Sequence, residues 1–315
     1  MALEPGKFEL NQDSHNQIVK NLMRRTKQLT PESVSQGGAW YKSGNQDAEY
    51  LGGQFGGGTL GASSAIAKLS ASTDWNKNRM MGLQLPKLDD HATKLIHRST
   101  EIGREMRGEG RSAEEISGET RALRARAGLS GTPLSLQTSD NISAALRVRD
   151  NEVDHPLDVF NLKKNGSNKT RDFALALNSA GTHPAAVIDT HAYDAAMDSY
   201  HIPYGTGNTH LAKAGVYSFM QNAYADAHQK ALKSKLVPEG TSLSDFQAMH
   251  WMHQINNKVQ VNAKAARTAN ANITITGNLL KNNPDLDPAK HGLEPISLRT
   301  AQLDAFGSGS SDGRK

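Results

Sequence analysis

The stretch of residues 160–197 constrains the fold of this chain more than any other. A polar turn at residues 163–168, which contains one glycine, leads into a helix-like run at residues 169–180. A short turn and an apolar segment at residues 185–188 follow, and they place Asp189 directly ahead of a second helix-like run. A lysine at the start of one helix and a carboxylate at the start of the next make this stretch the first candidate for a functional site.

The composition favours helix along the whole chain. Only 37% of the 315 residues are apolar and 5% are aromatic, so a core must be rich in alanine, leucine and methionine. Alanine-rich sequences favour helix over strand, and we find neither the alternation of a half-buried strand nor an internal repeat. The length suffices for one large domain or two small ones. We therefore predict a mainly α fold.

Changes in composition divide the chain into three parts. We expect an N-terminal helical extension at residues 1–61, a helical core at residues 62–260, and a polar, disordered tail at residues 261–315. The glycine-dense residues 52–61 predict a hinge or a close-packing turn. A phosphate-binding loop would need a Lys-Ser/Thr pair after the glycines, and none follows.

Several helix boundaries can be predicted from capping residues and apolar spacing. Thr30 and Pro31 are suited to the N-cap and the first position of a helix. Apolar residues recur every four positions through Gly215, which predicts that the longest helix begins near Asn208. Ser139 is expected to cap an earlier helix, and Ser242 or Ser244 to cap the last one. Residues 89–127 predict charged helices with a solvated face and local ion pairs, although their arginines would also suit nucleic acid.

Charge and cysteine content exclude some classes of protein. The net charge of +4 and the pI of about 9.1 permit a polyanionic partner without requiring one. The absence of cysteine excludes disulfides, thiolate zinc sites and iron–sulfur clusters. No run is long enough to span a membrane, and the N-terminus lacks the apolar stretch of a signal peptide. We expect a cytoplasmic protein.

Four segments in order resemble the helix-hairpin-helix DNA glycosylase superfamily, of the endonuclease III kind. Residues 69–78 look like its early L-S-x-Q-x-T-D…N helix junction, and residues 166–170 look like its G-x-G-x-K-T hairpin. Residues 187–191 are similar to the V-D-T-H segment before the catalytic helix, and Trp251 lies where the closing helix often has an aromatic residue. The resemblance covers roughly residues 62–254. It extends to phage-encoded members that share an early W-Y pair and a late Q-A-x-x-W motif.

This resemblance implies a DNA-binding hairpin and a catalytic pair. A hairpin between two helices directs backbone N–H groups and a helix N-terminus at a phosphate, and nearby basic side chains add charge. The chain departs from the family in having one hairpin glycine, Gly166, where two are usual, and Ser72 where a glutamine inserts into the duplex. The residues expected to contact double-stranded DNA are Lys163, Lys164, Gly166, Ser167, Asn168, Arg171, Ser72 and Thr73.

In the same frame, Asp189 and Lys169 are the expected catalytic residues. A carboxylate beside C1′ stabilises the positive charge that develops when an N-glycosidic bond breaks. A lysine amine at the same place could attack C1′ and form a Schiff base, on a base flipped out of the stack. The alternatives are structural: Asp189 as a helix N-cap and Lys169 as a phosphate contact.

The remaining candidates favour structural interpretations. His250 and His253 have a spacing that could chelate a metal, but no third ligand is evident, and we expect them on a polar helix face. The aromatics Trp40, Tyr41 and Trp75, with Trp251, are expected in the core rather than as stacking platforms. We expect no metal site and no cofactor. The alternatives to a base-excising or base-modifying enzyme are a non-catalytic DNA-binding protein and a virion structural protein.

Overall fold

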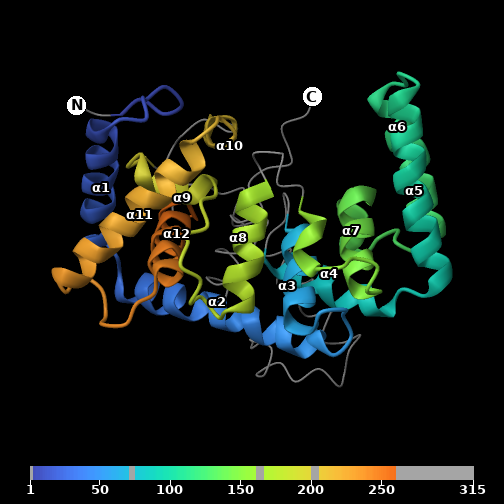
Figure 1. Ribbon diagram of the computed structural model, residues 1–315, viewed down its shortest axis with the longest axis horizontal. Helices are drawn as coiled ribbons and strands as arrows, with labels where there is room; N and C mark the ends of the chain where they lie inside the picture. Colours follow the sequence, from blue (N-terminus) through green and yellow to red (C-terminus); the bar gives the residue numbers. More distant parts are fainter. Residues whose placement is uncertain (1–2, 71–74, 161–166, 200–205, 260–315) are drawn as a thin grey trace.

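The long helix α2 (Pro31–Gly52) runs along one side of the molecule and joins its two halves (Figure 1). The structure, a computed structural model, describes residues 3–70, 75–160, 167–199 and 206–259. These residues form helices and no strand, which confirms the predicted mainly α fold. The other α-helices are α1 (Gln12–Thr26), α3 (Gly58–Leu69), α4 (Trp75–Gln84), α5 (Asp90–Gly108), α6 (Ala113–Arg126), α7 (Ser139–Arg149), α8 (Ser167–Asn178), α9 (Thr190–Ala196), α10 (Thr206–Leu211), α11 (Val216–Lys233) and α12 (Leu243–Val259). Short 3₁₀ helices lie at η1 (Leu85–Lys87), η2 (Pro133–Leu136) and η3 (Pro156–Val159).

The buried apolar side chains form two clusters. The Ile66 cluster is built mainly by α2, α3, α7 and α8, and includes Leu51 and Leu177. The Ile18 cluster is built by α1, α9, α11 and α12, and includes Tyr193 and Phe246. Both clusters combine residues from before and after position 61. Helices α1 and α2 therefore contribute to the same hydrophobic clusters as the later helices.

Helix α2 continues through the adjacent Gly37 and Gly38 because it packs closely on α12. An ideal Cβ atom at position 37 would lie 2.5 Å from the Cα atom of Met249 and even closer to its backbone nitrogen. Only glycine lets the two backbones approach this far. Thr30 is the N-cap and Pro31 the first residue of this helix, as predicted.

The glycine-dense turn after α2 is a close-packing turn. An ideal Cβ atom at Gly61 would overlap the carbonyl oxygen of Gly56, so a side chain there would force the turn open. Gly57 has a φ of 78° and begins α3 in the left-handed conformation. The turn brings α3 back against α2.

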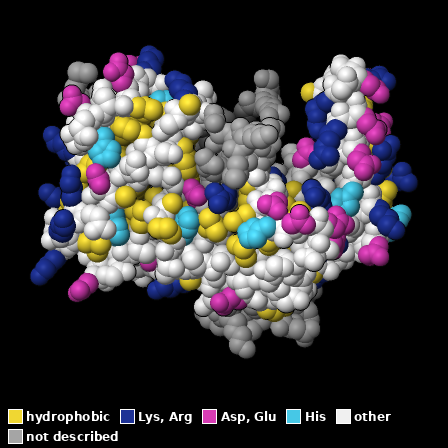
Figure 2. Space-filling view, viewed as in Figure 1, with side chains coloured by type: hydrophobic (Ala, Val, Ile, Leu, Met, Phe, Trp, Pro, Cys, Tyr) yellow, Lys and Arg dark blue, Asp and Glu magenta, His cyan; other side chains and the backbone are white. Residues whose placement is uncertain are grey.

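Helices α5 and α6 form a charged arm that projects from the Ile66 half (Figure 1). Basic and acidic side chains alternate over it on the face shown in Figure 2. Arg98 pairs with Glu101 and Glu105, and Arg111 pairs with Glu115. The predicted solvated helices with local ion pairs are confirmed. Exposed pairs of this kind contribute little stability.

Two helix starts differ from the prediction. Gly215 adopts a φ of 80° and is the N-cap of α11, so the apolar stripe expected to be one helix is divided into α10 and α11. The longest helix in the described part of the chain is α2, with 22 residues. Thr138, one residue before the predicted Ser139, caps α7 by accepting from the Asn141 N–H. Ser242 accepts from the Asp245 N–H at 2.9 Å at the start of α12, as predicted.

Across the described part of the chain, no helix combines the length and apolar character that crossing a membrane requires. The predicted disordered tail at residues 261–315 lies outside the described residues.

Candidate functional site

Lys169 and Asp189 line one pocket, although twenty positions separate them in sequence. Lys169 lies in the first turn of α8, as predicted, and Asp189 is the N-cap of α9. The pocket has a volume of about 110 Å³. An apolar cavity of roughly 150 Å³ can hold benzene, so this pocket is on the scale of a single aromatic ring.

Asp189 reaches the pocket because the segment before it is anchored in the core. Ala186, Val187 and Ile188 are buried, and the backbone at Asp189 is extended. One carboxylate oxygen, Oδ1, accepts a hydrogen bond of 2.8 Å from the backbone N–H of Ala192. The interpretation of Asp189 as a helix N-cap is therefore confirmed. The same carboxylate lies in the pocket wall, so capping and pocket lining coexist in one side chain.

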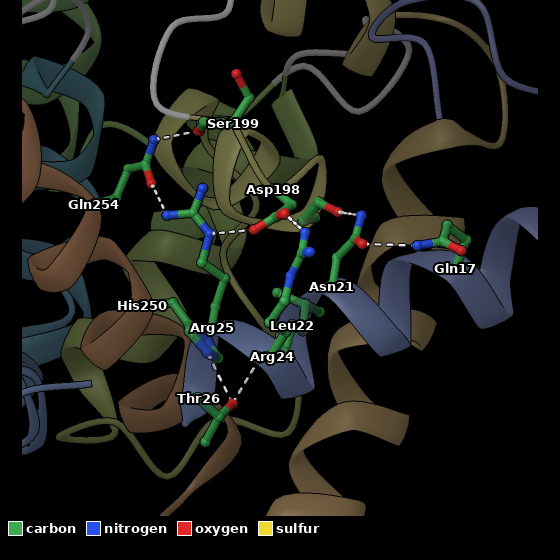
Figure 3. Close-up of polar contacts among 11 residues, drawn as sticks. Gln17, Asn21, Leu22, Arg24, Arg25, Thr26, Asp198, Ser199, His250 and Gln254 are labelled. Carbon is green, nitrogen blue, oxygen red and sulfur yellow. Dashed lines mark hydrogen bonds and ion pairs between the residues drawn. The ribbon is translucent and has the colours of Figure 1, made fainter. Parts of the chain in front are cut away.

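The C-terminal end of α9 is fixed by a set of side chains that we call the Arg25 network (Figure 3). The buried Arg25 donates from Nε to Asp198 Oδ1 at 2.8 Å and from Nη1 to Gln254 Oε1 at 3.0 Å. Gln254 in turn donates to the Ser199 carbonyl at 2.7 Å, and Arg24 also pairs with Asp198. Helices α1 and α12 thereby hold the end of the short helix that begins at Asp189.

His250 belongs to this network, and the expectation that His250 and His253 lie on a polar helix face is wrong. Both side chains are buried, because that side of α12 faces α9, α11 and the end of α1 rather than solvent. His250 Nε2 lies 3.0 Å from Thr26 Oγ1. Burial, then His253 and Arg25, lowers the pKa of His250 to about 3, so the imidazole is neutral at physiological pH.

The walls of the pocket are aromatic, with rings from α2, α4, α8 and α12. Trp40 lies at their centre, with ring centroids 4.8 Å from Trp75, 5.0 Å from Trp251 and 5.8 Å from Phe173. The chain contains three tryptophans, and all three line this pocket. Trp75 is buried, as expected for core, whereas Trp40 and Trp251 are only partly buried. The rings therefore pack the core and also form the pocket surface.

A buried tyrosine and glutamine add a polar pair to the pocket. Tyr41 is 2% exposed, and its hydroxyl donates to Gln247 Oε1 at 3.0 Å. Burial raises the pKa of Tyr41 well above its usual range, and the carboxylates of Asp189, Asp245 and Asp172 raise it further. The phenol is therefore a neutral donor, and it fixes the orientation of the glutamine amide.

Asn78 and Trp251 supply buried polar atoms that have no hydrogen-bond partner among the described residues. Asn78 is 1% exposed, and neither its amide nitrogen nor its amide oxygen has a hydrogen-bond partner among the described residues. The buried indole Nε1 of Trp251 likewise has none in that part of the chain. Both residues line the pocket.

The sequence motifs contain Tyr41, Asn78, Gln247 and Trp251. They did not predict that these side chains line one pocket. The available signal was the Q-A-x-x-W motif, because Gln247 and Trp251 are four residues apart and lie on one face of a helix. The W-Y pair on α2 gave a similar signal. Neither motif indicated that α2 and α12 bring these residues together.

The predicted DNA contacts fall mostly at the edges of the described structure. Ser72, Thr73, Lys163, Lys164 and Gly166 lie outside the described residues. Ser167 and Asn168 are the first two residues of α8, and Arg171 is half-buried in its second turn. The start of α8 therefore carries three of the predicted contacts, together with Lys169.

The fold and pocket define an all-α protein with an aromatic site that holds a lysine and a carboxylate. The chain belongs to DUF7178, a family of unknown function whose model matches residues 7–259. The matched range includes both core clusters and every residue of the pocket. No curated protein and no solved structure matches the chain.

Proposed function

We propose that this protein is a DNA glycosylase-like enzyme that acts on a base flipped into the pocket. One observation carries the proposal: Lys169 and Asp189, the two predicted catalytic residues, line the same ring-sized aromatic pocket. They come from different helices, so their meeting is not a consequence of sequence proximity. The proposal includes cleavage of the N-glycosidic bond or a related modification of the base.

The aromatic walls suit a nucleobase. A flipped base has lost its stacking neighbours, and aromatic side chains replace them at roughly 1–3 kcal/mol per base. Trp40 and Trp251 are partly exposed in the pocket, so their rings are available to an incoming ring. A base in this position would bring its sugar toward the residues at the pocket wall.

The chemistry assigned to Asp189 is electrostatic. As the glycosidic bond breaks, positive charge develops on the sugar, and a nearby carboxylate stabilises it. Its hydrogen bond from the Ala192 N–H holds the carboxylate in place before the reaction, which avoids reorganisation during bond cleavage.

The chemistry assigned to Lys169 is nucleophilic. The amine, after losing a proton, forms a bond from Nζ to C1′ while the bond from C1′ to the base breaks, and the base leaves with a proton. Ring opening of the sugar would then give a Schiff base with the lysine. A water molecule in place of the lysine would give simple hydrolysis.

The start of α8 suits a phosphate of the same DNA strand. The first N–H groups of a helix and its positive end favour anions. The predicted contacts Lys163 and Lys164 precede it in sequence, and each phosphate contact adds to the salt dependence of binding. Such contacts position a duplex without reading its sequence.

One observation favours a second candidate, a DNA-binding protein that kept the fold without the activity. The Asp189 carboxylate already has a structural partner in the Ala192 N–H. A cap of this kind needs no reaction to explain it. Activity measurements separate the two candidates.

The test replaces Asp189 and a matched aspartate far from the pocket. Asp89 caps α5 through the same 2.8 Å hydrogen bond, from the Ala92 N–H, and it does not line the pocket. We expect Asp189→Asn to fold and bind DNA but to release no base from oligonucleotides that carry damaged or unusual bases. Asp89→Asn should retain the activity of the parent protein. Full activity in Asp189→Asn would refute the catalytic assignment.

Borohydride trapping tests the lysine. The parent protein should form a covalent adduct with DNA, and Lys169→Ala should not, whereas Lys230→Ala on the exposed end of α11 should still form it. Base release without trapping would assign the nucleophile to water. Binding without any reaction on the panel would favour the second candidate.

A salt titration tests the DNA contacts. Replacing Lys163 and Lys164 with alanine should lower the slope of log affinity against log salt by up to about two units. The same double replacement at Lys230 and Lys233 should leave the slope unchanged. Equal slopes for both double variants would mean that Lys163 and Lys164 are solvated and contact no phosphate.

A further inference from the structure

The side-chain amide of Asn78 is a buried polar group on a residue that lines the pocket. It is 1% exposed, lines the pocket, and has no hydrogen-bond partner among the described residues for either amide atom. A buried polar group in this state costs roughly 1–3 kcal/mol of stability. Native proteins contain few of them, and each calls for a reason. A ligand that supplies the missing partners is such a reason.

Trp251 presents a second group of the same kind. Its indole Nε1–H is a donor only, is buried, and has no partner in the described part of the chain. Its ring packs edge-on against Trp40, with centroids 5.0 Å apart, and this contact fixes its orientation. A buried indole N–H normally finds an acceptor, and Trp251 is one of the residues that line the pocket.

We propose that Asn78 and Trp251 recognise the hydrogen-bonding edge of the ring that enters the pocket. The asparagine amide offers a donor beside an acceptor, which pairs with an acceptor beside a donor on a heterocycle. The indole N–H requires one more acceptor. The pocket therefore selects a ring with one donor and two acceptors over a ring in which that donor is blocked. This inference rests on the proposed function, because it assigns the specificity of the same pocket.

Uridine and cytidine both present this pattern, and a methylated analogue lacks it. Uridine carries the set as one ring N–H between two carbonyls, and cytidine carries it as an amino group, a ring nitrogen and a carbonyl. In 3-methyluridine the donor is replaced by a methyl group. A site built to bind a polar group rejects the analogue that lacks it, because its own buried groups are then unpaired.

The tryptophans give a direct measurement of ring entry. Because all three tryptophans of the chain line this pocket, quenching of intrinsic tryptophan fluorescence reports on this pocket above all. The full chain would be titrated with uridine, cytidine and 3-methyluridine. Calorimetry under the same conditions would give the affinities independently.

The variants remove one group at a time. Asn78→Leu removes the amide and keeps the volume approximately, and Trp251→Phe removes the indole N–H and keeps an aromatic ring. Trp40→Phe is the matched control for the loss of one tryptophan, because Trp40 contributes no buried unpartnered N–H in the described residues. Far-UV circular dichroism and thermal unfolding would verify that each variant is folded.

We expect Asn78→Leu and Trp251→Phe each to weaken uridine binding about tenfold. Trp40→Phe should weaken it by less than about threefold. The parent protein should bind 3-methyluridine about tenfold more weakly than uridine, and Asn78→Leu should bind the two equally. This set forms a double-mutant cycle between the amide and the ring N–H.

The outcomes separate this inference from the proposed function. Equal binding of uridine and 3-methyluridine by the parent, with no loss in Asn78→Leu, would overturn the edge recognition and leave the base pocket intact. Base release that depends on Asp189 but not on Asn78 would do the same. No binding of any nucleoside up to its solubility, together with no reaction on DNA, would overturn both.

Discussion

The Arg25 network and the pocket are two buried polar regions that both take side chains from α12, and the side-chain amides of Gln254 and Asn78 differ in how they are paired. In the network, Arg25, Asp198 and Gln254 each contact two partners within the protein. In the pocket, Asn78 contacts none among the described residues. Protein interiors tolerate buried polar groups when these are paired. The comparison suggests that the network serves the fold and that the pocket serves a ligand.

The two regions are also mechanically linked. The network fixes the end of α9, and the start of α9 places Asp189 in the pocket. Helix α9 has only seven residues, so movement at one end is transmitted to the other. A change in the network should therefore affect the site, whereas a change at Asn78 should leave the network intact.

The largest effect should come from breaking the network. Arg25→Ala removes the buried partner of the Asp198 carboxylate, leaves it with the more exposed Arg24, and removes a donor from Gln254. Breaking a buried ion pair in this way costs about 3–5 kcal/mol. Urea denaturation would measure the loss in the free energy of unfolding.

Asn78→Leu is the opposite case and serves as the control. The amide has no partner to lose among the described residues, so we expect stability to be unchanged or to rise by about 1 kcal/mol. A large loss of stability in Asn78→Leu would show that the amide has a structural role, and the contrast between the two regions would fail.

The next effect should come from the contact between α2 and α12, which supports the pocket. Gly37→Ala would push a methyl group into the backbone of Met249, and we expect a loss of about 3 kcal/mol. At Gly38 the nearest atom is the Met249 Cε at 3.7 Å, so Gly38→Ala should instead stabilise the helix by about 0.5–1 kcal/mol. Thermal unfolding compares the two. Similar effects in both variants would mean that the close approach is absent in solution.

A pH titration tests the burial of His250. Its pKa is about 3 in the folded protein and about 6.5 in an unfolded chain. Between these values the unfolded chain binds a proton that the folded protein does not. The free energy of unfolding should therefore fall as the pH falls from 6.5 toward 3, by up to about 1.4 kcal/mol per pH unit from this group. Above pH 6.5 the contribution is constant.

Urea denaturation at several pH values, with His250→Gln as the reference, isolates this contribution from that of the carboxylates. The parent protein should lose stability more steeply than the variant below pH 6.5. Parallel curves would mean that the imidazole takes up its proton in the folded state and is not buried as described.

The smallest effect should appear at Asp189. As a cap, Asp189→Asn should cost little and Asp189→Ala about 1 kcal/mol. Asp89→Asn and Asp89→Ala should give the same pair of values, because the two caps have the same geometry. A gain in stability in Asp189→Asn alone would indicate that the carboxylate is strained in the pocket, which is common at functional sites.

Local features of the fold could be predicted from the sequence. Thr30 with Pro31, Ser242 and Asp189 all cap helices through hydrogen bonds to residues three positions away, so the information lies within one turn. The charged helices of residues 89–127 could be predicted for the same reason, since their ion pairs are largely local. Lys169 in the first turn of α8 follows from the polar turn before it.

Features that depend on distant contacts could not be predicted from the sequence. Glycine is unfavourable inside a helix, and only the tertiary structure supplies the reason for Gly37, which is the close approach of the Met249 backbone. Gly215 fits an apolar stripe of period four, yet it adopts a left-handed conformation and divides the stripe. The side chain of His250 is polar by type, and the helices around α12 bury it.

The sequence by itself determined the helical class, most of the helix starts and the two residues on which the proposed chemistry rests. The tertiary structure alone decided that Trp40, Trp75 and Trp251 line one pocket with Lys169 and Asp189, and that Asn78 is buried there without a partner among the described residues. The physical reason is the range of the interactions. Caps and helix propensity act within a few residues, whereas a pocket exists only where side chains from several helices meet and leave a space that none of them fills.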